Sequence, residues 1–292
     1  MAPPHGLAAA RGCGMISIII PAHNEETVIE RCLAALLDGA EPGELELIVA
    51  CNGCSDATAE KARSFGPPVQ VIEIAQASKT AAINAAERLA TAFPRLYVDA
   101  DVVLPLSGAR AVAETLQNGH LLASPVADTD LGASSAAVRA FYDIWLRLPY
   151  NRVMVGTGVY ALSKEGRARF GEFPPIIADD GYVRSRFAPQ ERVAVPEAKV
   201  RVVAPRTLGD LVRVKTRVRQ GLYQLQTQCP GKSVTDSKDM RAVLLSLPKS
   251  LALPWQMLVY LTVNAVVRFR ARRARNANFL QKWHRDDAAR IA

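Results

Sequence analysis

Two aspartates separated by a single residue, Asp99 and Asp101, have the side chains with the clearest chemical potential in this chain. They follow the short apolar segment 96–98, and side chains at positions i and i+2 of an extended segment project to the same side. Such a pair of carboxylates can hold Mg²⁺ or Mn²⁺, and cations held by carboxylate oxygens commonly serve phosphate groups. The alternative is that the two aspartates only solvate a turn or cap the next helix.

A second polar loop follows an apolar strand near the start of the chain. Residues 18–26 read Ile-Ile-Ile-Pro-Ala-His-Asn-Glu-Glu, so three isoleucines run directly into polar side chains. Open α/β sheets bind their ligands outside the carboxyl ends of the strands. The two segments together therefore predict a nucleoside-diphosphate site at one edge of a sheet.

The hydrophobic periodicity predicts the elements that would position these loops. Strands are expected at 15–21, 45–50, 69–74 and 96–98, with helices at 26–37, 56–64 and 79–92 between them. This alternation indicates a largely parallel sheet with helices on both faces, a Rossmann-like α/β fold. An extended segment at 193–203 and a basic helix at 207–226 are expected to complete the same domain. The predicted boundaries are a disordered extension at 1–14, a catalytic domain at 15–230 and a helical, basic C-terminal segment at 231–292.

Composition restricts the class of protein. The chain has 292 residues and is 49% hydrophobic, which is enough for a full core. Its formal charge is +8, but residues 268–292 hold eight Lys or Arg against two Asp, a net of +6, so the remainder carries only +2. A near-neutral body argues against a nucleic-acid partner, although the basic tail keeps anionic lipid open. Five irregularly spaced cysteines argue against a secreted disulfide framework and favour a cytoplasmic location.

Five motifs in this order resemble the family 2 glycosyltransferases, inverting enzymes with the GT-A fold. The motifs are Pro21-Ala22-His23-Asn24-Glu25-Glu26, the segment from Cys51-Asn52-Gly53 to Thr58, Lys79 with the following Ala81-Ala82-Ile83-Asn84, Asp99-Ala100-Asp101, and Asp179-Asp180. The resemblance runs from about residue 15 to residue 219. It implies a nucleotide-sugar donor, no cofactor beyond Mn²⁺ or Mg²⁺, and transfer to an acceptor hydroxyl.

The resemblance also implies roles for individual residues. Asp101 with Asp99 would hold the metal, and Asp180 would act as general base beside Asp179. The nucleotide site would comprise Pro21, Ala22, His23, Asn24, Glu25, Asn52, Lys79, Asp99, Arg217 and Arg219. Gly156, Thr157 and Gly158 would position the acceptor or the donor sugar, although glycine in a strand can equally mark a bulge.

The sequence departs from the family pattern at Cys51 and Asn52, where an aspartate pair is usual. A carboxylate for the uracil edge is therefore missing, but an amide can both donate and accept hydrogen bonds. We expect a UDP-linked sugar. Arg213, Lys215 and Arg217 fit a solvated helix face as well as a diphosphate site. Phe141, Trp145 and Leu148 have the spacing of a helix that faces a core.

The C-terminal segment leaves three arrangements open. Residues 251–267 are seventeen uncharged residues followed by the cluster Arg268-Phe269-Arg270-Ala271-Arg272-Arg273. The segment can pack on the enzyme, lie at an anionic membrane surface, or marginally span a bilayer. A saccharide or lipid-linked acceptor, including a cell-envelope polysaccharide, and a location at the inner face of the cell membrane follow from the second arrangement. A nucleotidyltransferase on a similar sheet, a Cys51-x-x-Cys54 redox protein, and a nucleic-acid-binding or anionic-lipid-binding protein are the alternative functions.

Overall fold

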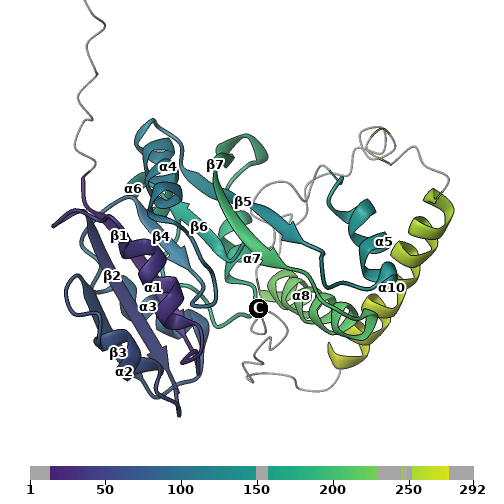
Figure 1. Ribbon diagram of the computed structural model, residues 1–292, viewed down its shortest axis with the longest axis horizontal. Coiled ribbons are helices and arrows are strands. Elements are labelled where there is room, and N and C mark those ends of the chain that lie inside the picture. Colours follow the sequence, from purple (N-terminus) through teal and green to yellow (C-terminus); the bar gives the residue numbers. More distant parts are fainter. Residues whose placement is uncertain (1–13, 149–156, 229–244, 246, 248–251, 276–292) are drawn as a thin grey trace, which may run out of the picture.

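A seven-stranded mixed sheet forms the centre of the molecule (Figure 1). The computed structural model describes residues 14–148, 157–228, 245, 247 and 252–275. Its strands are β1 (Ile16–Ala22), β2 (Leu45–Asn52), β3 (Val69–Ile74), β4 (Arg95–Val98), β5 (Leu122–Asp130), β6 (Val159–Leu162) and β7 (Arg192–Val203). They lie in the order β3-β2-β1-β4-β6-β5-β7, and only β6 runs antiparallel to its neighbours. This arrangement confirms the predicted α/β fold with a mostly parallel sheet.

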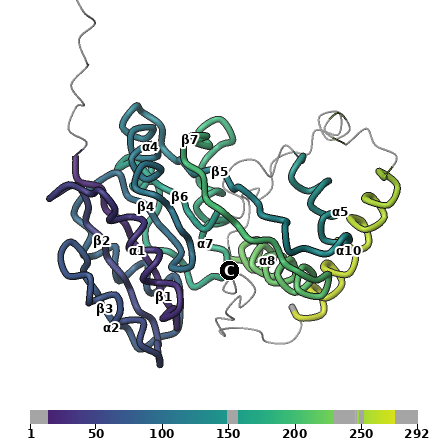
Figure 2. Tube along the Cα trace, viewed as in Figure 1, coloured from purple at the N-terminus to yellow at the C-terminus, as the bar shows by residue number. Residues whose placement is uncertain are grey.

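Helices surround the sheet and extend beyond its β7 edge (Figures 1 and 2). They are α1 (Ile29–Leu37), α2 (Thr58–Arg63), α3 (Lys79–Glu87), α4 (Leu106–Gln117), α5 (Ala136–Trp145), α6 (Lys164–Arg167), α7 (Asp179–Arg184), α8 (Leu208–Gln228) and α10 (Leu253–Arg275), with a 3₁₀ turn at Pro189–Glu191. The N-terminal elements, purple in Figure 1, lie at one end of the molecule. The helices α5, α8 and α10 lie at the other end.

The core lies on both faces of the sheet because its central strands are apolar on both sides. All seven residues of β1 are buried. Ile18 and Ile20 pack into the cluster on one face, and Ile19 packs into the cluster on the opposite face. A strand covered on both faces must be apolar throughout rather than alternating, which is what the isoleucine run provides.

Most predicted elements are present, and the largest differences between predicted and observed ends are at α1 and α3. Helix α1 begins at Ile29 rather than at residue 26, because the Glu25 carbonyl accepts hydrogen bonds from the Val28 and Ile29 amides in a turn. Helix α3 ends at Glu87 rather than at residue 92. The chain leaves the helix there because Arg95 Nη2 donates to the Ala90 carbonyl, which ties the following loop to β4.

The second half of the chain joins the same sheet. β6 pairs with β4, and β5 and β7 extend the sheet on that side. Residues 1–13, and 231–292 apart from 245, 247 and 252–275, lie outside the described residues. The predicted extension at 1–14 and most of the predicted C-terminal segment therefore stay predictions.

Helix α10 packs against α5 and α8 to form a separate helical cluster. Its buried residues Val259, Val263 and Val267 repeat every four positions and contact apolar residues of α5 and α8. The Gln256 amide donates to Asp143 of α5 at 2.8 Å. Within the described residues, no helix is long and apolar enough to cross a membrane. The described part of the segment, 252–275, packs on α5 and α8.

Candidate active site

Three charged side chains meet at the carboxyl end of β4. Lys79, the first residue of α3, places its Nζ 2.6 Å from Asp99 Oδ1 and 2.9 Å from Asp179 Oδ1. Asp99 follows β4, and Asp179 opens α7. Residues about a hundred positions apart in the sequence are thus joined by one ammonium group, at the sheet edge where ligands of open α/β sheets bind.

Asp179 and Asp180 are adjacent but differ in environment. Asp179 is 2% exposed, and its carboxylate accepts hydrogen bonds from Lys79 and, at 3.1 Å, from the Tyr160 hydroxyl. Asp180 is open to solvent, and its Oδ1 accepts a hydrogen bond from the Gly181 amide at 2.7 Å. Asp179 therefore holds the start of α7 in place, while Asp180 presents a carboxylate to the cavity.

The electrostatics of this cluster follow from burial and close charges. Burial raises the pKa of Asp99 to about 6, and the adjacent Lys79 charge only partly opposes this effect. Burial alone would lower the pKa of Lys79, but the charges of Asp179 and Asp99 raise it, so the ammonium stays protonated. The Asp180 carboxylate is solvent-accessible yet lies deep among protein atoms, and this desolvation with the Asp179 charge raises its pKa. Perturbed carboxylates in a cleft are typical of functional sites.

Gly158 supports Asp99 through its backbone. Its carbonyl accepts the Asp99 amide at 2.9 Å, and its φ is +63°, a conformation that side chains disfavour. A Cβ on Gly158 would lie 2.7 Å from Val102 Cγ2 and 3.2 Å from Asp99 Oδ2. The neighbouring Thr157 hydroxyl donates to the Val159 carbonyl at 2.8 Å. Gly156 lies outside the described residues, so its predicted contact with a sugar stays a prediction.

The residues present fit a divalent cation that is shared with a substrate. Among the residues that the structure describes, no group of three or more His, Cys, Asp or Glu side chains forms a complete protein site. Asp99 and Asp101 supply two carboxylates, and both line the cavity. Mg²⁺ and Mn²⁺ are commonly held by one or two carboxylates plus substrate phosphates and water. This donor set therefore suits a cation that binds together with a diphosphate.

The predicted nucleotide loop at the end of β1 is tied to the loop after β2. His23 Nδ1 lies 2.6 Å from the Asn52 carbonyl oxygen, and the Asn24 Oδ1 accepts the Ser55 amide at 2.8 Å. The Glu25 amide donates to Thr58 Oγ1 at 2.7 Å, while Pro21 is buried in β1. These contacts set the shape of the loop.

Asn52 is the exception in this region because part of its side chain has no described partner. Its Nδ2 donates to the Ala22 carbonyl at 2.7 Å, and the residue is fully buried. Its Oδ1 has no hydrogen-bond partner within the described part of the chain. A buried acceptor without a partner carries a desolvation cost, which a bound N–H donor would remove.

The two cysteines of this region also belong to the loop contacts. Cys51 is buried in β2, and the Asn24 amide lies 3.4 Å from Cys54 Sγ. A hydrogen bond from the Cys51 thiol lowers the pKa of Cys54 to about 6. Both are free thiols.

A cavity of about 1010 Å³ extends from this cluster between the sheet and the helices α5, α8 and α10. It has the size of a ligand pocket. The predicted site residues that line it are Lys79, Asp99, Asp101, Thr157, Gly158, Asp179, Asp180, Arg217 and Arg219. The residues 21–25 and Asn52 are not part of its lining, and they lie at the ends of β1 and β2.

The sequence analysis did not predict one cavity-lining residue, Tyr160, and placed another, Lys215, on a solvated face. Tyr160, which holds Asp179, lies in a short apolar strand and carries no recognisable signal. Lys215 was grouped with Arg213 and Arg217 as part of a solvated face, yet its Nζ lies 3.7 Å from the centroid of the Trp145 ring. Helical spacing could not show whether Lys215 faces solvent or the ring of Trp145, because α8 has basic residues on several faces.

Solved structures with a similar fold include glycosyltransferases. A mannosyltransferase from Pyrobaculum calidifontis, in complex with GDP-Man and Mn²⁺, has a TM-score of 0.60 at 21% identity, over 90% of this chain and 80% of that one. Glucosyl-3-phosphoglycerate synthase from Mycobacterium tuberculosis, in complex with Mn²⁺, UDP-glucose and glycerol 3-phosphate, has a TM-score of 0.56 at 19% identity, over 78% and 86%. No curated protein sequence matches the chain.

The fold of this protein is that of the GT-A glycosyltransferases. Residues 17–152 match the family described as Glycosyl transferase family 2. The chain thus contains a family 2 glycosyltransferase domain, which confirms the family indicated by its motifs.

Proposed function

We propose that this enzyme transfers a sugar from a nucleoside-diphosphate donor to an acceptor hydroxyl with inversion at the anomeric carbon. The observation that carries the proposal is the position of Asp180. Its open carboxylate lines the same cavity as Asp99, Asp101 and Lys79, so the proposed base and the proposed diphosphate site would face one space. A single displacement requires this pairing of an acceptor-activating base with leaving-group stabilisation.

In the proposed step, Asp180 takes the proton of the acceptor hydroxyl. The acceptor oxygen forms a bond to the anomeric carbon while the bond from that carbon to the diphosphate oxygen breaks, and the nucleoside diphosphate leaves. The raised pKa of Asp180 makes it a better proton acceptor than an ordinary aspartate. Lys79 supplies a fixed positive charge near the site where the diphosphate charge develops, and Asp179 and Asp99 keep it in place.

A divalent cation, Mn²⁺ or Mg²⁺, would be held by Asp101 and Asp99. When bound, it neutralises the charge that builds on the departing diphosphate. The two similar solved structures named above contain Mn²⁺, which favours that ion. Asp99 pairs with Lys79 here, so its carboxylate is already oriented by a positive charge.

The base of the donor is proposed to bind beside Asn52. The partnerless Asn52 Oδ1 can accept the ring N–H that both uracil and guanine carry, and we propose UDP as the carrier. One similar structure holds GDP-Man and the other UDP-glucose, so GDP is the alternative to test. The nearby contacts of His23 and Asn24 hold the loop that would cover the nucleoside.

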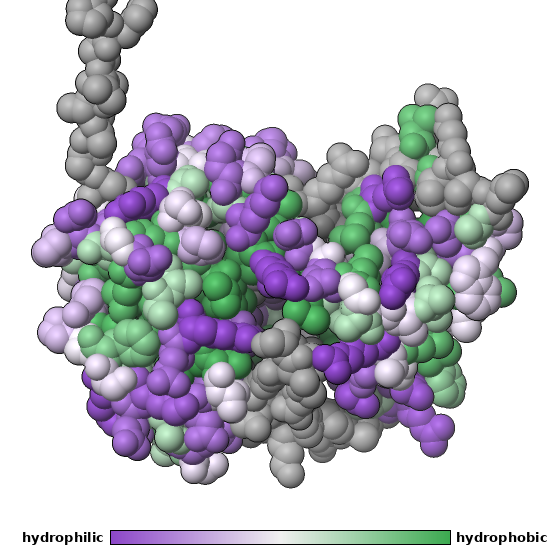
Figure 3. Space-filling model, in the orientation of Figure 1, coloured by the Kyte–Doolittle hydropathy of each residue, from purple (hydrophilic) through white to green (hydrophobic). Residues whose placement is uncertain are grey.

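Peripheral contact with an anionic membrane, through the outer face of α10, is proposed as a second property. Trp255, Leu258, Leu261 and Phe269 are exposed on this helix, and Arg270, Arg272 and Arg273 are exposed near its end. Apolar side chains followed by a basic cluster are typical of helices that lie in a membrane interface. Figure 3 shows hydrophobic patches among hydrophilic residues over the helical end of the molecule. This surface would suit a lipid-linked acceptor and a location at the inner face of the membrane.

The donor site is tested by the thermal stability of the purified protein with UDP, GDP, CDP or dTDP, each with and without Mn²⁺. A ligand at about a hundred times its dissociation constant stabilises the folded state by roughly 2.7 kcal/mol. We expect a Mn²⁺-dependent rise in the melting temperature with UDP that Asp101→Asn removes. Thr115→Val, which changes an α4 side chain bonded only within its own helix, is the control. A rise with none of the four diphosphates would contradict the proposal.

A further inference from the structure

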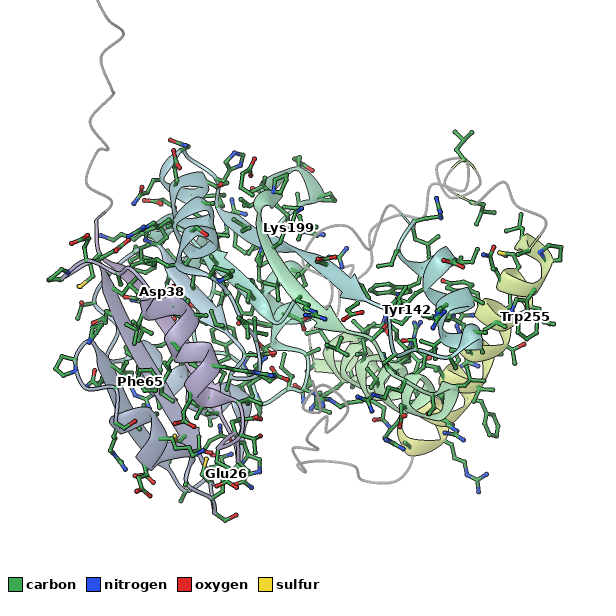
Figure 4. The ribbon with its side chains drawn as sticks, in the orientation of Figure 1. Glu26, Asp38, Phe65, Tyr142, Lys199 and Trp255 are labelled. Atoms are coloured by element: carbon green, nitrogen blue, oxygen red, sulfur yellow. The ribbon has the colours of Figure 1, made fainter. Side chains whose placement is uncertain are left out.

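The carboxylates Asp99, Asp101, Asp179 and Asp180 line one part of the cavity, and we call them the acidic cluster. The cavity has a second part, away from this cluster, that the proposed transfer step does not use. Its walls include rings from α5 and α10, namely Phe141, Tyr142, Trp145 and Tyr260, together with Lys215 of α8. We call these five residues the aromatic compartment. Figure 4 marks Tyr142 at α5 and Lys199 on β7, the strand whose residues 199–203 line the same cavity.

Lys215 points its amine at the aromatic rings. Its Nζ lies 3.7 Å from the ring centroid of Trp145, 5.3 Å from that of Tyr142 and 5.6 Å from that of Phe141. Stacking between Phe141 and Tyr260, with centroids 5.3 Å apart, fixes the wall from which these rings project. Ammonium groups are attracted to aromatic faces, which explains why the lysine is tolerated there.

The amine has no acidic partner in the described part of the chain. Arg213 of α8 pairs with Asp210, whereas Lys215 forms no ion pair with any described residue. Desolvation by the surrounding protein lowers its pKa to about 7. A desolvated ammonium without a counter-ion is unfavourable, so a ligand that brought a negative charge to this position would be bound strongly.

The rim of the compartment adds positive charge. Lys199 of β7, Arg217 of α8 and Arg268 of α10 line the cavity with Lys215, against Asp128 of β5. Arg201 of β7 also lines it, but its charge is paired with Asp130. The other cavity-lining carboxylates, Asp99, Asp101, Asp179 and Asp180, belong to the acidic cluster. The cavity is thus acidic where the metal and base are proposed, and basic in the remainder.

The compartment lies too far from the nucleoside loops to serve the donor base. β4, β6 and β5 separate β1 from β7 in the sheet. At about 4.8 Å between neighbouring strands, β7 lies roughly 19 Å from β1. The helices that carry the compartment pack beyond β7, on Leu131 and Ala204. The molecule that reaches this part of the cavity is therefore the acceptor rather than the nucleoside.

We infer that Lys215 binds an anionic group, a phosphate or carboxylate, on the acceptor, and that the rings of the compartment pack against the carbon skeleton beside that group. This inference rests on the proposed function, since it assigns the acceptor of that same reaction. It makes Lys215 a specificity-determining residue. The anion can belong to a soluble phosphorylated molecule or to the headgroup of a lipid.

Trp145 provides the readout for the test. The chain has three tryptophans, and replacing Trp255 and Trp283 by phenylalanine leaves Trp145 as the sole one. Its emission is recorded while sn-glycerol 3-phosphate is added, with glycerol as the uncharged comparison, in the presence and absence of UDP and Mn²⁺. We expect a saturable emission change with glycerol 3-phosphate and none with glycerol.

Three variants in that background identify the residue responsible. Lys215→Met should weaken glycerol 3-phosphate binding at least tenfold, and Lys215→Arg should restore most of it. Arg213→Met, an exposed position of the same helix that pairs with Asp210, should bind like the parent protein. If Lys215 only braces α8 against α5, Lys215→Met will lower the melting temperature and leave the emission response unchanged, which overturns the inference.

Two further measurements distinguish a soluble phosphate from a lipid phosphate, and the anionic acceptor from the proposed donor. Phosphatidylcholine vesicles with phosphatidic acid, compared with vesicles without it, report a lipid phosphate by the same emission change. A response to either phosphate probe that depends on Lys215 supports the inference, and a response to neither overturns it. The melting temperature with UDP and Mn²⁺ is measured on the same protein. If UDP and Mn²⁺ raise the melting temperature but neither phosphate probe changes the emission, only the anionic acceptor is rejected. If a phosphate probe changes the emission but UDP and Mn²⁺ do not raise the melting temperature, the proposed donor is rejected.

Discussion

Two adjacent carboxylates of identical chemistry have different environments in this enzyme. Asp179 is enclosed by Lys79 and Tyr160, whereas Asp180 faces the cavity with only a backbone amide as its described hydrogen-bond donor. Burial and partners, rather than residue type, therefore decide which of the two is available to an acceptor. The same logic applies to Lys79 and Lys215, one between two carboxylates and the other against aromatic rings.

At the residue scale, we predict that Asp180→Asn lowers the transfer rate by about 10²–10⁴, the usual contribution of a general base. Donor binding should persist, as measured by the Mn²⁺-dependent melting shift. Because the base acts when deprotonated and its pKa is raised, the wild-type rate should rise with pH through a midpoint above that of an ordinary aspartate. A pH profile flat across that region would argue against Asp180 as the base.

Asp179→Asn is the matched comparison at the adjacent position. It leaves Lys79 with one carboxylate instead of two and weakens the contact with Tyr160, so the free energy of unfolding should fall by about 1–3 kcal/mol. Urea denaturation of both variants measures this difference. Equal loss of stability in the two variants would mean that burial does not separate their roles.

At the scale of elements, β4 and the start of β6 together set the position of Asp99. The last residue of β4 pairs with the first of β6, and the Gly158 carbonyl continues this contact by accepting the Asp99 amide. A positive φ and a close approach meet at this one glycine. The position of Asp99, a proposed metal ligand, therefore depends on a residue without a functional side chain.

We predict that Gly158→Ala loses stability and Mn²⁺-dependent donor binding together. The positive φ alone costs roughly 1–2 kcal/mol for a residue with a Cβ, and the new methyl group would press on Val102 and Asp99. Gly66→Ala is the control, because its φ is +62° and no atom lies within 4 Å of the added Cβ. Urea denaturation should show a loss of stability in both variants. The Mn²⁺-dependent melting shift with the diphosphate should be lost only in Gly158→Ala.

At the scale of the whole molecule, the order of strands separates the proposed donor and acceptor functions. The loops after β1 and β2 lie at one end, the acidic cluster lies at β4 in the middle, and α5, α8 and α10 lie beyond β7. Figure 1 shows this progression along the longest axis. Helix α10 both closes the cavity and presents an outer face, so membrane contact would bring a lipid-linked acceptor near that end.

We predict that the double variant Leu258→Ser with Leu261→Ser reduces sedimentation with anionic vesicles about tenfold. These side chains are 59% and 58% exposed, so the free energy of unfolding should change by less than about 1 kcal/mol. Leu89→Ser, at an exposed leucine after α3, is the control. Salt should weaken the binding of the parent protein because the arginine contribution is screened. Unchanged sedimentation in the double variant would exclude the outer face of α10 as the contact.

The strand and helix pattern of the N-terminal half followed from local sequence. Apolar runs and helical spacing depend on neighbouring residues, so β3 at 69–74 was predicted with both ends correct, while α1 and α3 differ where loop contacts shorten them. The order of five short motifs was likewise enough for the family. Each of these signals is contained within a few residues of the chain.

Only the tertiary structure decided which of the predicted residues meet, and in what environment. The contacts of Lys79 with Asp99 and Asp179, of Tyr160 with Asp179, and of Lys215 with Trp145 join residues from 19 to 100 positions apart. Local periodicity carries no information about such distant neighbours. Burial, charge partners and pKa depend on those neighbours, so the sequence determined which groups were present and the fold determined what each of them can do.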